Sequence, residues 1–236
     1  MADDPNLPAG SASQGEINDF LAKVRAVGAT RPAGRPARLA FALDATASRQ
    51  PTWDLACALQ AEMFDVAASL GGLEVQLVYY RGLRECRASG YVTEAQKLAA
   101  LMGRISCEGG RTQIGRVLGH LERQASEAGL PAAVFVGDAL EEDAGTLLEA
   151  AGRLGVRGLK LFVFQEGHDK SVERVFREMA ALTGGAWCRF DAGAADELRA
   201  LLRAVATYAA GGSAALLASG DAGARRLLAA MPSGKA

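Results

Sequence analysis

The chain has 236 residues, of which 50% are hydrophobic and 22% are charged, and its formal net charge is −1. This length and composition suffice for one well-filled core, or for one domain with extensions, and argue against a disordered chain. The near-neutral charge argues against a general nucleic-acid binder, because such proteins carry a basic face.

The chain carries no recognisable localisation signal. The N-terminus, Met1–Pro5, is acidic and lacks the basic-then-apolar pattern of a secretory signal. No uncharged apolar stretch reaches the roughly 20 residues of a membrane span. The cysteines are widely spaced and form no C-x-x-C pair, which argues against a zinc or redox motif. We therefore expect a cytoplasmic protein with reduced cysteines and without membrane association.

Residues 1–36 are predicted to be an N-terminal extension with one amphipathic helix and a linker. Ser13–Glu16 is typical of a capping box, and apolar residues follow at helical spacing as far as Val27. The stretch from Gly28 to Arg38 is rich in Pro and Gly, as in a linker. The apolar stripe of the helix over 13–27 must be buried against this domain, a second copy or a different protein. A homo-oligomer through this helix is one of these expectations.

Predicted strands and helices alternate from residue 37 onward. Strands are expected at 39–43, 73–80, around 85–88, at 132–136, 159–164 and 186–190, the third as half of a hairpin. Helical stripes are expected over 55–70, 98–105, 114–121, 147–154, 172–182 and 198–205. This order predicts an α/β, Rossmann-like, doubly wound sheet of six mostly parallel strands, with one antiparallel edge strand and helices on both faces. The domain is predicted to span 37–208, and 209–236 a Gly/Ala-rich C-terminal extension in which 225–231 docks on a groove.

Five oxygen-bearing side chains are expected at one edge of this sheet. Asp44, Thr46 and Ser48 follow the first strand, Asp138 follows the fourth, and Thr112 lies between a Gly-rich loop and a helix. Parallel sheets bind ligands beyond the carboxyl ends of their strands, so these side chains should share one edge. Carboxylate and hydroxyl oxygens are the donors that Mg²⁺ prefers.

These residues and their order resemble the metal-ion-dependent adhesion site of von Willebrand factor A domains. That family carries D-x-S-x-S after its first strand, a threonine in a Gly-rich loop and an aspartate after its fourth strand. The resemblance covers roughly residues 37–208. The sequence departs from it with Thr46 in place of the first serine, Arg49 where methionine is common, and Arg111 inserted just before Thr112.

The resemblance implies a protein-interaction module of a small bacterial type and not an enzyme. In such a site the three hydroxyl groups and the two aspartates hold Mg²⁺, with Mn²⁺ or Ca²⁺ as alternatives. One coordination position stays open for a carboxylate of a partner protein. Two carboxylates roughly balance a dication, so the bound cation stays electrophilic. Arg49, Arg111 and His168 are expected at the rim that contacts the partner.

Other readings stay open. Thr46 or Ser48 can cap the helix that follows, and Thr112 can cap its own. An aspartate after the first strand also resembles the nucleophilic aspartate of haloacid dehalogenase-type phosphotransferases. In an enzyme of that kind Asp44 would be the nucleophile. In that reading Thr46 stands where a second aspartate is needed for proton transfer. A third hypothesis is a degenerate domain that holds a complex together without metal.

Overall fold

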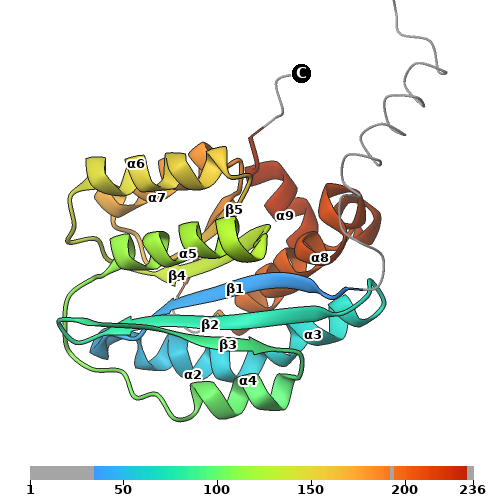
Figure 1. The fold of residues 1–236 in the computed structure, drawn as a ribbon, viewed down its shortest axis with the longest axis horizontal. Helices are drawn as coiled ribbons and strands as arrows, with labels where there is room; N and C mark the ends of the chain where they lie inside the picture. The colour runs from blue at the N-terminus through green and yellow to red at the C-terminus, as the bar shows by residue number, and fades with distance from the viewer. Residues whose placement is uncertain (1–34, 192–193, 233–236) are drawn as a thin grey trace, which may run out of the picture. The chain divides into compact units, whose positions relative to one another are not determined.

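The structure, a computed structural model, describes residues 35–191 and 194–232. In this part of the chain one six-stranded sheet has the order β3-β2-β1-β4-β5-β6 (Figure 1). Its strands are β1 (Ala37–Asp44), β2 (Leu73–Arg81), β3 (Glu85–Val92), β4 (Ala132–Gly137), β5 (Lys160–Glu166) and β6 (Trp187–Phe190). Neighbouring strands are parallel except β2 and β3, which are antiparallel. The predicted mostly parallel α/β sheet with an antiparallel edge strand is confirmed.

The central strand β1 is buried on both faces. Leu39, Phe41 and Leu43 point into one hydrophobic core, and the small residues Ala40 and Ala42 point into the other. A strand with a core on each side has no solvent face, which explains its continuous apolar sequence.

Helices cover both faces of the sheet (Figure 1). One core is closed by α2 (Gln50–Leu59), α3 (Ala61–Ala68) and α4 (Ala95–Met102), together with α8 (Ala195–Ser219) and α9 (Ala222–Ala230). The other is closed by α5 (Ile114–Ala128), α6 (Ala144–Val156) and α7 (Lys170–Thr183). The helix predicted over 55–70 is present as α2 and α3, which meet at Gln60, where the backbone stays helical.

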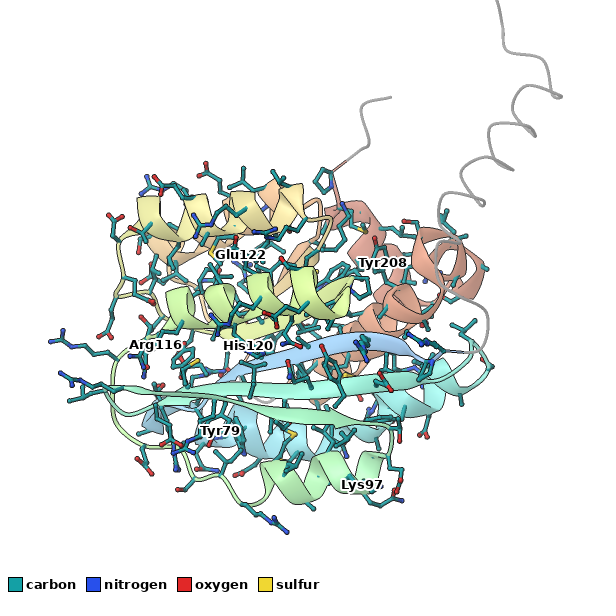
Figure 2. The ribbon with its side chains drawn as sticks, viewed as in Figure 1. Tyr79, Lys97, Arg116, His120, Glu122 and Tyr208 are labelled. Atoms are coloured by element: carbon teal, nitrogen blue, oxygen red, sulfur yellow. The ribbon has the colours of Figure 1, made fainter. Side chains whose placement is uncertain are left out.

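The helical structure continues past residue 208, where the domain was predicted to end. The long helix α8 is interrupted at Gly212, whose φ of 66° lies in the region that favours glycine. Tyr208 packs edge-to-face on Phe162 of β5, with ring centroids 5.1 Å apart (Figure 2). Leu216 and Leu227, which follow the interruption, are buried in the same core as β1. Residues 209–232 therefore lie within the compact unit that also contains the sheet.

Some expectations are not decided by this fold. The predicted helix over 13–27, and any oligomer formed through it, lies outside the described residues. By length and composition alone, α8 could cross a membrane, although a core helix has the same composition. Its residues Leu198, Leu201 and Leu202 are buried in the domain core.

The four cysteines, all in the described part, are free thiols.

Candidate metal site

Asp44 ends β1, and its carboxylate is buried and fixed in orientation. The residue is 3% exposed. Its Oδ1 accepts a hydrogen bond from the backbone N–H of Thr46 at 2.7 Å, and its Oδ2 accepts one from the hydroxyl of Tyr80 at 2.8 Å. Burial raises the pKa of Asp44, hydrogen bonds from Thr46 and Tyr80 oppose this, and the negative charge of Asp138 adds to the rise. Burial thus outweighs the hydrogen bonds in its effect on the pKa of Asp44.

Thr46 and Ser48 lie just after β1, around the short 3-10 helix η1 (Ala47–Arg49). Thr46 is the N-cap residue of η1 but makes no side-chain capping hydrogen bond. Its side chain instead lowers the pKa of Asp44 by a hydrogen bond. Ser48 is exposed, and the N-cap residue of α2 is Arg49. The capping roles that would give these hydroxyls a purely structural purpose are therefore not observed.

Asp138 follows β4 directly and lies beside the end of β1. These two strands are parallel neighbours, with Leu43 opposite Val136, so both aspartates leave the sheet at the same edge. Oδ1 of Asp138 is buried and has no hydrogen-bond partner among the described residues. Its Oδ2 lies 3.4 Å from the guanidinium of Arg49. A buried oxygen without a partner carries a desolvation cost, which a cation bound there would remove.

Thr112 is buried just before α5 and is held by the loop that follows β4. Its hydroxyl accepts a hydrogen bond from the N–H of Glu141, and its own N–H donates to the Glu141 carboxylate, both at 3.0 Å. The carboxylate of Glu142 caps α5 by accepting from the N–H groups of Ile114 and Gly115 at 2.9 and 2.8 Å. These bonds bring the loop of Thr112 to the same edge. They also place a negative charge against the positive end of α5.

Solved structures match this fold, whereas no family model and no curated protein sequence matches the chain. A von Willebrand factor type A protein from Catenulispora acidiphila aligns with a TM-score of 0.57 at 18% identity, over 75% of this chain and 43% of its own. The fold is that of a von Willebrand factor A domain.

Two further structures with this fold span different shares of their own chains. An aerotolerance-related membrane protein from Bacteroides fragilis aligns at 16% identity and a TM-score of 0.53, over 69% of this chain and 94% of its own. Proximal thread matrix protein 1 from the mussel byssus, with zinc occupying its MIDAS motif, aligns at 16% identity and a TM-score of 0.51, over 75% and 46%. This chain thus spans less than half of the Catenulispora and mussel proteins. At such identities the likeness concerns the von Willebrand A fold alone.

Contrary to the prediction from the sequence, Arg49 does not lie on the rim of this site. It is 3% exposed, and its guanidinium contacts the carboxylates of both Asp138 and Glu166. Glu166 also accepts a hydrogen bond from the hydroxyl of Thr52. The guanidinium pairs with the buried carboxylate of Glu166 and the half-buried carboxylate of Asp138, so Arg49 forms part of the site's interior and cannot contact a partner.

The other two predicted rim residues are exposed in loops. Arg111 donates its backbone N–H to the carbonyl of Gly82 at 3.0 Å, in the turn between β2 and β3. His168 follows β5 and lies 3.1 Å from Asp191. Both side chains are accessible to a partner, and their contact with one stays a prediction.

Sequence reasoning missed two residues of this site, Tyr80 and Glu166. Tyr80 lies opposite Asp44 in the pairing of β1 with β2, so the register of the two strands would have placed its hydroxyl. Glu166 ends the apolar strand β5, and an acidic residue at the end of such a strand is the same signal that pointed to Asp138.

The donor set fits a hard divalent cation. Within the described residues no three His, Cys, Asp or Glu side chains are grouped so that they could hold a metal. A cation at this edge would therefore need hydroxyl oxygens in addition to Asp44 and Asp138. Carboxylate, hydroxyl and water oxygens are the ligands of Mg²⁺ and Mn²⁺.

Proposed function

We propose that this von Willebrand A domain is a metal-dependent protein-interaction module. In this proposal a divalent cation beyond the ends of β1 and β4 binds a carboxylate of a partner protein. The observation that carries the proposal is the buried Oδ1 of Asp138, which has no partner among the described residues and lies on the strand next to Asp44. Such an oxygen is costly in a metal-free site and is satisfied by a cation.

Asp44 and Asp138 would supply the negative charge, and the hydroxyls of Thr46, Ser48 and Thr112 would complete the protein ligands. The bound cation, which we take to be Mg²⁺ with Mn²⁺ or Ca²⁺ as alternatives, supplies a Lewis-acidic position for the partner's carboxylate. The mussel protein with zinc at its MIDAS supports the idea that this fold accommodates a divalent cation at such a motif.

The proposal includes no catalytic step and places the protein in the cytoplasm. A phosphotransferase reading would need Asp44 as the nucleophile. Its two carboxylate oxygens already accept hydrogen bonds from the Thr46 N–H and the Tyr80 hydroxyl. That reading also needs an aspartate for proton transfer at position 46, where this chain has Thr46, so we favour a binding role for the Asp44 carboxylate.

One observation favours a second candidate function, that of a metal-free scaffold domain. The guanidinium of Arg49 lies 3.4 Å from Asp138 and gives that carboxylate a positive partner without any metal. A domain of this kind would bind its partner through the same loops but independently of divalent cations.

Calorimetric titration with Mg²⁺ and with Mn²⁺ separates the two functions. We expect saturable binding by the wild type and its loss in the double variant Asp44→Ala/Thr112→Ala. The matched control is Asp143→Ala/Thr146→Ala, which removes the same residue types from the cap of α6 and should keep the binding. Binding that survives Asp44→Ala/Thr112→Ala would place the cation elsewhere and refute the proposed site. A wild type that binds neither cation would support the metal-free scaffold.

A further inference from the structure

Arg49 and Glu166 form a buried ion pair directly beside the candidate metal site. Arg49 is 3% exposed and Glu166 is 9% exposed. Nη2 of Arg49 contacts Oε2 of Glu166, and its Nη1 lies 3.4 Å from Oδ2 of Asp138. The hydroxyl of Thr52 donates to the same Glu166 oxygen. Arg and Glu are almost never this buried unless they are paired, so the two residues depend on each other.

The two oxygens of the Asp138 carboxylate have different surroundings. Oδ2 faces Arg49, whereas Oδ1 is buried without a partner among the described residues. A cation that binds Oδ1 would therefore share one carboxylate with a fixed positive charge. Like charges that share a carboxylate repel each other, and burial strengthens the repulsion because solvent screens it less.

Arg49 lowers the net negative charge of the site. Asp44, Asp138 and Glu166 contribute three negative charges, and Arg49 contributes one positive charge, which leaves two negative charges. This remainder equals the charge of one divalent cation. An arginine stays protonated at any physiological pH, so its contribution does not vary as that of a histidine or lysine would.

We propose that Arg49 acts as a fixed positive charge within the site. Its guanidinium holds Asp138 in place when no metal is bound and thereby weakens metal binding. Glu166 limits this effect, because it holds the guanidinium through its closer contact and leaves Oδ1 of Asp138 free. The inference rests on the metal site proposed above and adds a residue that sets its affinity.

Calorimetry with Mn²⁺ tests the inference on the full chain. The single variant Arg49→Met leaves the buried charge of Glu166 without a counter-charge, so the main variant is Arg49→Met/Glu166→Gln, which keeps the net charge of the site. Its matched control is Arg153→Met/Glu122→Gln, which removes Glu122 of α5 from exposed ion pairs with Arg153 at 3.1 Å and with Arg157 at 3.0 Å. Glu122 is labelled on α5 in Figure 2.

We expect Arg49→Met/Glu166→Gln to bind Mn²⁺ more tightly than the wild type, because the guanidinium that it removes shares the Asp138 carboxylate with the cation. The gain should be less than the roughly tenfold effect of a unit charge several ångströms from a dication at the permittivity of water, because the variant also removes the negative charge of Glu166. The control should bind as the wild type does. In EDTA, the main variant should melt at a lower temperature than the wild type, and saturating Mn²⁺ should close that gap.

Two results would overturn the inference, and they differ in what they say of the proposed function. Unchanged or weaker Mn²⁺ binding by Arg49→Met/Glu166→Gln, still abolished by Asp44→Ala, would refute the role of Arg49 and leave the metal site standing. Absence of Mn²⁺ binding in both the wild type and this variant would refute both. Binding by the variant alone would support the inference.

Discussion

Replacing Tyr80 with phenylalanine removes a single hydroxyl group from the centre of the candidate site. That hydroxyl donates to Oδ2 of Asp44 at 2.8 Å, and Tyr80 is 0% exposed. The ring stacks on Phe135 with centroids 6.5 Å apart, and phenylalanine keeps this packing. A hydrogen bond to a charged group contributes about 1.5–3 kcal/mol. Each kcal/mol lowers the Tm of a domain of this size by about 2–4 °C, so Tyr80→Phe should melt about 3–12 °C below the wild type.

Thermal and urea unfolding in EDTA, followed by circular dichroism, measure this loss. Tyr79→Phe is the matched control, because the Tyr79 hydroxyl donates to Glu85 at 3.0 Å in a less buried setting (Figure 2). Solvent screens that bond, so its removal should cost at most about 1 kcal/mol. In the Asp44→Asn background the effect of Tyr80→Phe should shrink, since the charged acceptor is gone. Equal losses for Tyr80→Phe and Tyr79→Phe, or no coupling to Asp44, would refute this reasoning.

Two further predictions concern pH and the C-terminal helices. Burial raises the pKa of Asp44 in the folded state, so its contribution to stability is complete below the unfolded pKa of about 3.9 and is lost as the pH rises through the folded pKa. Relative to the wild type in EDTA, Asp44→Asn should therefore gain stability as the pH rises, and a pH-independent difference in urea unfolding would contradict this. Leu227→Ala should cost about 2–5 kcal/mol, because Leu227 is 0% exposed in the core. Leu217→Ala, on α8 at a site 66% exposed, should cost little in the same urea assay. If Leu227→Ala lost as little stability as this control, α9 would not belong to the core.

The order of strands and helices could be predicted because strands buried on both faces have an unmistakable apolar run. The ends of elements were harder to predict. β3 extends to Val92 because backbone pairing with β2 holds a strand whose residues are mostly exposed or half-buried, so its sequence has no apolar run. α8 is interrupted at Gly212, and helical structure resumes beyond it because Leu216 is buried in the core.

The candidate site could be predicted where topology alone determines it. Asp44 and Asp138 end neighbouring parallel strands, and any such pair meets at one edge. Arg49 could not be placed in this way, because a charged residue after a loop serine is ordinarily exposed. Its burial depends on Glu166, which lies 117 residues further along the chain, and no local pattern signals a pair so distant.

The charged side chains of the site also affect how it would bind a partner's carboxylate. Without metal, three carboxylates and one guanidinium leave the interior of the site with two negative charges. A partner carboxylate is then repelled, whereas a bound dication neutralises the site and offers it a ligand position. Glu141, which accepts from the N–H of Thr112, and Glu142, which caps α5, add further negative charge near this edge. On the proposed function, partner binding therefore depends on the cation for charge as well as for coordination. Arg49 makes the metal-free site less repulsive, which narrows the difference in partner affinity between the two states.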